Sequence, residues 1–138
     1  MFYFIFILQE KFADVPTFQI KKEKLCQIFP RFGFNVEVYN NLFAEGINQT
    51  ILTKAKDKKL KKYNSLIICI MSHGGSGVVY GSDGKPVSVR KLQYAFNSFD
   101  CPQLHDKPKI IFIEACRIPN HAKGRQFLRV IYFLKDIV

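Results

Sequence analysis

Two short, unbroken apolar runs constrain what this chain can fold into. Residues 65–71 read SLIICIM and residues 109–115 read KIIFIEA, and turn-forming residues bound both runs. Runs of this length are typical of central strands in a parallel sheet that is covered on both faces. In open sheets of this kind, ligands bind at the carboxyl ends of the strands. The residues that follow the two runs are therefore the first candidates for a functional site.

The rest of the chain alternates between strand and helix patterns. We expect further strands at residues 2–8 and 34–39, and helices at about 19–31, 44–62 and 88–98. Asp83 and Gly84 lie between two β-branched stretches, which predicts a small hairpin. Strands that alternate with helices form a mostly parallel sheet. The expected fold class is α/β, a three-layer sandwich with helices on both faces of the sheet.

Apolar residues at helical spacing, or in alternation along a strand, predict which side of each element faces the core. The expected inward positions are Ile20, Leu25 and Ile28 in the first helix, Phe34, Val36 and Val38 in the second strand, and Leu92, Ala95, Phe96 and Phe99 in the last helix.

The chain carries a net charge of +10, much of it in the lysine-rich run 54–62. A basic surface favours acidic partners, nucleic acid among them. No aromatic residue interleaves these lysines, although single-strand nucleic-acid sites commonly combine both. Ile47, Ile51 and Ala55 precede and enter the run at helical spacing. We therefore interpret the lysines as the solvated face of a helix rather than as a nucleic-acid site.

The chain has four cysteines, Cys26, Cys69, Cys101 and Cys116, and no pair has CxxC spacing. This argues against zinc and thioredoxin-type sites and favours a reduced, cytoplasmic protein. Cys69 lies inside an apolar run and is expected in the core. The apolar segment 1–8 lacks a basic n-region and a small-residue cleavage site, so we interpret it as a strand rather than a signal peptide.

His73 and Cys116 follow the two apolar runs almost directly. A thiolate and an imidazole form the minimal nucleophile–base pair, if both strands end at the same edge of the sheet. The other histidines, His105 and His121, lie in polar loops and are expected at the surface. A single Cys or His at a strand end is more often structural. Their combination makes a cysteine hydrolase the leading interpretation.

The residues around this pair resemble the large subunit of the caspases. Ser72, His73 and Gly74 lie at one strand end and Glu114 to Arg117 at the next. His73 and Cys116 are 43 residues apart (116 − 73), close to the roughly 50 of the caspase signature. Further motifs agree in order, namely Phe32-Gly33-Phe34, Ser82-Asp83-Gly84 and Cys101-Pro102. The resemblance covers roughly residues 2–118.

This resemblance implies a cysteine endopeptidase of regulated proteolysis and apoptosis, located in the cytoplasm. Cys116 would be the nucleophile and His73 the base and acid, and the backbone N–H groups of Gly74 and Cys116 would form the oxyanion hole. The substrate would be a peptide or protein, and the chain would form a homo- or heterodimer with a caspase-type chain. No metal, cofactor, nucleic acid or membrane is implied.

Several positions depart from the caspase pattern. Glu114 stands where the family carries a Gln that helps to hold a substrate aspartate, so Glu114 is expected in the substrate pocket. Ile118 replaces a Gly, and no Arg occurs between Phe12 and Lys21, where the family carries a pocket Arg. A carboxylate there would repel aspartate or would favour Arg and Lys. The alternative is that Glu114 turns toward Arg117 or a lysine and leaves the pocket neutral.

We expect residues 1–118 to form a caspase large-subunit-like domain. Residues 119–138 would then be an inter-subunit loop and possible start of a truncated small subunit. Because so little sequence follows Cys116, an edge of the sheet near 110–113 or 127–134 should stay open. The alternative function is a catalytically impaired caspase-like regulator that binds caspases or adaptors. Phe43 takes the place of a helix-capping hydroxyl, so the second helix should lack that cap.

Overall fold

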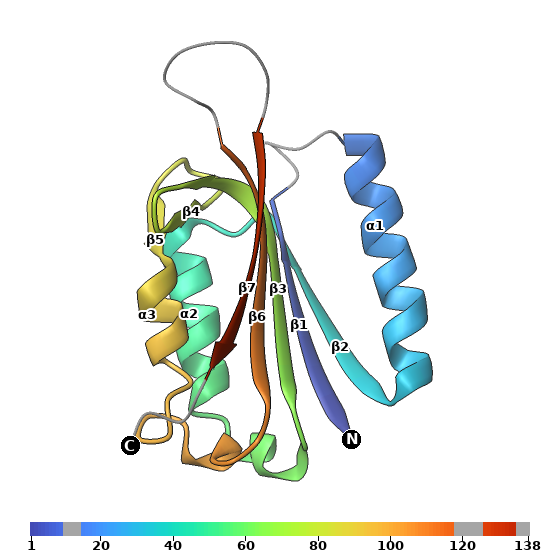
Figure 1. The fold of residues 1–138 in the computed structure, drawn as a ribbon, viewed down its shortest axis with the longest axis vertical. Helices are drawn as coiled ribbons and strands as arrows, with labels where there is room; N and C mark the ends of the chain where they lie inside the picture. Colours follow the sequence, from blue (N-terminus) through green and yellow to red (C-terminus); the bar gives the residue numbers. More distant parts are fainter. Residues whose placement is uncertain (10–14, 118–125, 135–138) are drawn as a thin grey trace.

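The computed structural model describes residues 1–9, 15–117 and 126–134. Its main strands are ordered β2–β1–β3–β6–β7 across one sheet (Figure 1). Their bounds are β1 Phe2–Leu8, β2 Phe34–Asn40, β3 Leu66–Gly75, β6 Lys109–Arg117 and β7 Gln126–Leu134. The first four strands of this order are parallel, and β7 pairs antiparallel with β6. The predicted, mostly parallel sheet is confirmed.

Helices lie on both sides of this sheet, as predicted for the α/β class. Helix α1 (Val15–Ile28) lies on one face, whereas α2 (Ala44–Ala55) and α3 (Val89–Tyr94) lie on the other (Figure 1). The buried side chains accordingly form two clusters. The larger cluster joins the sheet to α2 and α3 and includes Ile5, Ile47, Ile68 and Phe96. Side chains alternate along each strand, so each strand contributes to both layers.

The smaller cluster lies under α1. Phe4, Cys69 and Met71 form its buried centre, and half-buried apolar residues pack around them, namely Leu25, Phe29, Phe34, Val36, Val38, Ile67 and Phe112. The predicted inward residues of the second strand and the predicted core position of Cys69 are both confirmed.

The first helix differs from its prediction. It begins at Val15 and ends at Ile28, where a 3₁₀ turn, η2 (Phe29–Phe32), continues the chain. Ile20 and Ile28, predicted inward, are 52% and 45% exposed, while Leu25 packs on the sheet as expected. The prediction failed because Leu25 and Phe29, four residues apart, form the row that touches the sheet. Ile20 and Ile28 lie beside that row.

The lysine-rich helix was predicted to reach residue 62 but ends at Ala55. Ile47, Ile51 and Ala55 form its buried row, and the next position of that row is occupied by Lys59. A charged side chain cannot continue a row that faces the core. The chain therefore turns at Asp57 into a second 3₁₀ helix, η3 (Lys58–Lys62), in which Leu60 is the buried residue.

The last predicted helix is also shorter than expected. Helix α3 ends at Tyr94, and a third 3₁₀ turn, η4 (Pro102–Leu104), follows later. Three of the predicted inward residues, Leu92, Ala95 and Phe96, are buried, but Phe99 is 91% exposed. The Asn97 side chain accepts hydrogen bonds from the backbone N–H groups of Phe99 and Asp100. This turn directs the chain away from the core, which is why Phe99 lies outside.

The predicted hairpin is present and closes the amino end of α2. Strands β4 (Val78–Tyr80) and β5 (Pro86–Ser88) pair antiparallel beside the end of β3. Phe43 at the N-cap supplies no capping side chain, as predicted, and Asp83 of the hairpin accepts the hydrogen bond from the Ala44 N–H instead, at 3.2 Å. A Cβ at Gly81 would lie 2.2 Å from that nitrogen, so the close approach requires glycine.

Among the described strands, β7 is the last of the sheet on its side and pairs only with β6. An open strand edge was predicted, and this is where it lies. No helix in the described ranges is long and apolar enough to cross a membrane.

Candidate active site

Both strands that carry the predicted pair run further than their apolar cores. Strand β3 continues to Gly75 and β6 to Arg117, so His73 and Cys116 lie inside paired strands rather than beyond them. Their Cα atoms are register partners in neighbouring parallel strands. Such strands are about 4.8 Å apart. The fold therefore brings the backbones of these two residues together at the carboxyl end of the sheet.

The side chain of His73 lies on the α1 side of the sheet. Cys69 and Met71 belong to the cluster under α1, and residues two apart in a strand share a face. His73 is half-buried, and its Nδ1 atom has no contact with solvent. A partly enclosed imidazole at this edge is suitably placed for proton transfer.

Gly74 lies between two strands, β4 and β6. Its register partners are Val79 and Arg117, and a Cβ added here would lie 2.5 Å from the Cβ of Ala115. A side chain therefore does not fit, because real Cβ contacts are essentially never so short. Packing alone accounts for glycine at this position, whether or not its N–H group also binds an oxyanion. Ser72, two residues before Gly74, is buried and donates a hydrogen bond to the carbonyl of Tyr80 at 2.6 Å.

Glu114 is paired with a lysine, as one of the alternatives predicted from the sequence had it, but the sequence did not identify which lysine. Lys21 of α1 donates to the Glu114 carboxylate, Nζ to Oε1, at 2.5 Å. The side chain of Glu114 is 12% exposed and that of Lys21 is 35% exposed. A positively charged pocket residue was expected only in the loop between Phe12 and Lys21, so Lys21 itself was not considered. A signal was nevertheless present, because Lys21 lies four residues before Leu25, the confirmed inward position of the same helix.

Two of the other cysteines, Cys69 and Cys101, are not suited to nucleophilic chemistry. Burial raises the pKa of the Cys69 thiol to about 12, and the charge of Glu114 adds to this effect. Burial likewise raises the pKa of Cys101, whose side chain is fully enclosed. Thiols with raised pKa values stay protonated at neutral pH, and the thiolate is the nucleophile. Cys26 lies half-buried on α1.

His105 does not lie at this edge of the sheet. His105 is exposed, as predicted, in the loop that precedes the amino end of β6, and its Nε2 lies 3.4 Å from the Asp106 carboxylate. His121 lies outside the described residues. In the described ranges, no group of three or more potential ligands could hold a metal ion.

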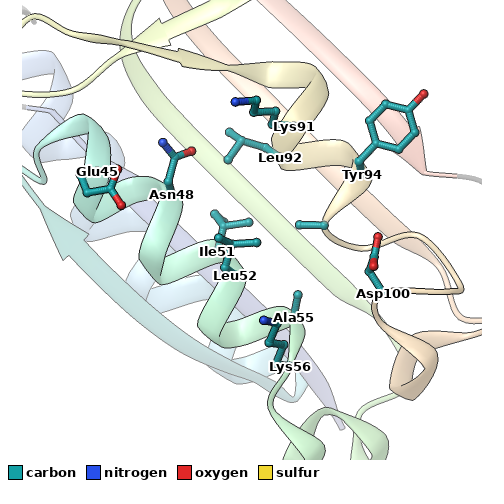
Figure 2. Close-up of a pocket in the computed structure, with 11 residues that line it drawn as sticks. Glu45, Asn48, Ile51, Leu52, Ala55, Lys56, Lys91, Leu92, Tyr94 and Asp100 are labelled. Carbon is teal, nitrogen blue, oxygen red and sulfur yellow. The ribbon is translucent and has the colours of Figure 1, made fainter.

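A hollow of about 570 Å³ lies elsewhere, between α2 and α3 (Figure 2). Its apolar floor comprises Ile51, Leu52, Leu92 and Ala95, and charged residues of both signs lie around it. It opens on the face of the sheet opposite to His73 and Glu114. The candidate site around His73 and Glu114 therefore does not include this hollow.

Comparisons with known proteins agree with the fold. The model of the caspase domain family matches residues 7–130. The chain is 41% identical over 114 residues to caspase-8 of Mus musculus, covering 83% of this chain and 24% of that protein. It is 34% identical over 97 residues to caspase-2 of Gallus gallus, covering 70% of this chain and 23% of the relative.

Cell death protein 3 of Caenorhabditis remanei is 31% identical over 123 residues, which cover 87% of this chain and 24% of that protein. The chain thus spans about a quarter of the length of each of these relatives. The family match includes both the His73 and the Cys116 strand ends and extends over most of the chain. The chain belongs to the caspase domain family of cysteine peptidases.

Proposed function

We propose that the carboxyl edge of β3 and β6 is the catalytic centre of a caspase-type cysteine endopeptidase, with Cys116 as nucleophile and His73 as base and acid. The observation that carries this proposal is the register that pairs His73 with Cys116. Two reactive residues 43 positions apart (116 − 73) share one edge, where α/β sheets bind their ligands.

The chemistry follows the logic of an activated thiol. His73 takes the proton of the Cys116 thiol, and the sulfur attacks the carbonyl carbon of the scissile peptide bond. The backbone N–H groups of Gly74 and Cys116 stabilise the oxyanion that forms. Collapse of this intermediate breaks the C–N bond, and the His73 imidazolium protonates the leaving amine. Water then hydrolyses the thioester of the acyl-enzyme and restores the free thiol.

The proposed partners and setting follow from the family. The substrate is a protein or peptide, and the chain acts as a homo- or heterodimer with a caspase-type chain, as its membership of the family suggests. We propose a cytoplasmic role in apoptosis-type regulated proteolysis. Residues 1–118 would act as the large-subunit-like domain and 119–138 as the connection to a small subunit.

A catalytically impaired regulator is the second candidate, and the pairing of Glu114 supports it. If Glu114 lies in the substrate pocket, Lys21 neutralises the Glu114 carboxylate and is not available to pair with a substrate aspartate. The pocket then offers no net positive charge to an acidic side chain. A chain that keeps the family fold but not its substrate preference could still bind a caspase through the shared fold.

A peptide probe with a thiol-reactive group tests the first candidate. The chain is treated with aspartate-directed and arginine-directed probes, alone and together with a full-length caspase whose own catalytic cysteine is replaced by Ala. We expect covalent labelling at Cys116, identified by mass spectrometry, and none in Cys116→Ala. Strongly reduced labelling is expected in His73→Asn.

Labelling spread over the other cysteines, or equal labelling of His73→Asn, would contradict the proposed centre. Absence of labelling under both conditions, combined with tight binding to the full-length caspase, would favour the regulator. The cleavage rates of fluorogenic aspartate and arginine peptides then measure the charge preference of the substrate pocket, with Glu114→Gln as the matched variant. Strong cleavage after aspartate that Glu114→Gln leaves unchanged would remove Glu114 from the pocket.

A further inference from the structure

The pair formed by Lys21 and Glu114 joins two elements that are distant in sequence. Lys21 lies on α1 and Glu114 on β6, 93 residues later, and their charged atoms are 2.5 Å apart. Both side chains lie on the α1 side of the sheet, which is also the side of His73. A charge pair that is mostly enclosed is screened less by solvent than one at the surface. Its effect on neighbouring charges is correspondingly larger.

The pair lies close to the proposed reacting atoms. Glu114 precedes Cys116 by two residues and is the register partner of Met71, which precedes His73 by two. Two residues of strand correspond to roughly 6.6 Å. At that separation, an uncompensated carboxylate would act strongly on a thiolate and on any charged group bound beside it.

We propose that Lys21 is a specificity-determining positioning residue, which holds Glu114 and cancels its charge at the edge where Cys116 reacts. The inference rests on the proposed role of Cys116. With the pair intact, a substrate side chain that reaches this position meets no net charge from Lys21 and Glu114. Such a site favours an uncharged residue beside the scissile bond over aspartate, arginine or lysine. A charged side chain of either sign would lose its hydration there without gaining an ion pair in return.

The charged residues near Cys116 come from four elements. They are Lys21 on α1, His73 on β3, Glu114 and Arg117 on β6, and Arg129 on β7, where it is the register partner of Glu114. Lys21 forms an ion pair with Glu114. If another residue supplied most of the compensation of Glu114, removing the Lys21 charge would change little. Removing the Lys21 charge therefore distinguishes these two arrangements.

Small charged thiol reagents measure the local charge without any peptidase activity. A cationic and an anionic methanethiosulfonate of similar size each react when the Cys116 thiolate attacks the reagent sulfur. A mixed disulfide forms and methanesulfinate leaves. All variants carry Cys26→Ser, so that the only thiols besides Cys116 are the buried Cys69 and Cys101. The measured quantity is the ratio of the cationic to the anionic rate, which cancels changes in thiolate fraction.

Lys21→Met should raise this ratio about tenfold, because it removes the positive charge that pairs with the Glu114 carboxylate. Glu114→Gln should lower it by a similar factor. The double variant should return close to the parent value, and Lys21→Arg should preserve it. The return to the parent value is expected because the double variant removes two opposite charges together. An unchanged ratio in Lys21→Met, or a double variant whose ratio stays far from the parent value, would overturn the proposal.

Lys22→Met is the matched control. It removes the same charge from the adjacent position of α1, but Lys22 hydrogen-bonds to Asn40 of β2, at 3.2 Å. Its ratio should stay within about twofold of the parent. A change as large as that of Lys21→Met would mean that helix charge in general, and not this pair, sets the ratio.

The two proposals fail in different ways. If Cys116 shows the predicted charge dependence but no peptide probe reacts with it, the role of Lys21 is supported and the peptidase function is contradicted. If peptides are cleaved but the ratio of the two reagent rates does not depend on Lys21, the peptidase function is supported and the role of Lys21 is contradicted. Circular dichroism on each variant checks that α1 and the sheet remain folded.

Discussion

His73 and Cys116 are Cα register partners in the neighbouring parallel strands β3 and β6, at the carboxyl edge of the sheet. A nearby imidazolium favours the thiolate form of a cysteine, and the thiolate is the reactive form. Replacing His73 by Asn should therefore lower the rate of Cys116 alkylation by iodoacetamide about tenfold near pH 6.5. Near pH 9.5, where the thiol ionises without help, the two proteins should react at similar rates. Parallel pH profiles without this convergence would argue against a coupled pair.

Gly74 and Ala115 make a contact that can be tested by exchange. Gly74→Ala should destabilise the fold by about 1–3 kcal/mol, since the new Cβ would lie 2.5 Å from that of Ala115. Adding Ala115→Gly should recover part of the loss, measured as the free energy of unfolding in urea. Gly46→Ala is the control, because its Cβ would meet Leu42 at an ordinary 3.5 Å in a helix that favours alanine.

Asp83 fixes the hairpin to α2 through a single carboxylate. Desolvation alone would raise its pKa, but hydrogen bonds from the backbone N–H groups of Ala44 and Lys85 outweigh this and keep the pKa below 3.8. The stabilisation of the fold by ionised Asp83 is therefore present above about pH 4 and is lost as the pH falls through the lowered pKa. Asp83→Ala should lower Tm at pH 7, and Asp83→Asn, which keeps an acceptor oxygen, should lower it less. Equal Tm values for all three proteins would contradict the capping role.

Glu37 of β2 links three other residues on the α2 side of the sheet. Lys54 Nζ lies 2.6 Å from its carboxylate and Tyr39 donates to it at 2.7 Å, while Tyr3 also bonds to it. Burial would raise the pKa of Glu37, but these hydrogen bonds together lower it below the ordinary 4.5. The stabilisation is thus fully present above that value and fades at lower pH.

Glu37→Gln should accordingly reduce the free energy of unfolding at pH 7 by about 1–2 kcal/mol. The difference from the parent should shrink as the pH falls from 5 toward 3. Urea titrations at several pH values measure both effects. A difference that is constant over this range would mean that the charge of Glu37 contributes nothing.

Strand β7 should promote self-association. It is the last described strand on its side, and its second edge has no partner among the described strands. Half-buried apolar residues of the neighbouring sheet face, Ile67, Ile110 and Phe112, line a hollow of about 340 Å³ beside α1. Open edges and apolar surface both favour association. Sedimentation velocity at increasing concentration should show a growing dimer fraction, whereas a monomer at all concentrations would contradict this.

Much of the architecture was predictable because it follows from local pattern. The apolar runs around Ile68 and Ile111 specified central strands, and the alternation of Phe34, Val36 and Val38 specified one inward face. The hairpin followed from Asp83 and Gly84. Where local pattern misled, a tertiary contact had decided the outcome. Helix α1 rests on the row of Leu25 and Phe29, and α2 ends where Lys59 would have faced the core.

The sequence by itself indicated that His73 and Cys116 lie near the carboxyl ends of two core strands, because the apolar runs that form these strands are a local pattern. Only the tertiary structure decided that these strands are adjacent and in register, since pairing across 43 residues depends on how β1 and β6 pack around β3. The same holds for Glu114. Its carboxylate was visible in the sequence, but its partner Lys21 was not assigned, because an ion pair between α1 and β6 exists only once the helix has packed on the sheet.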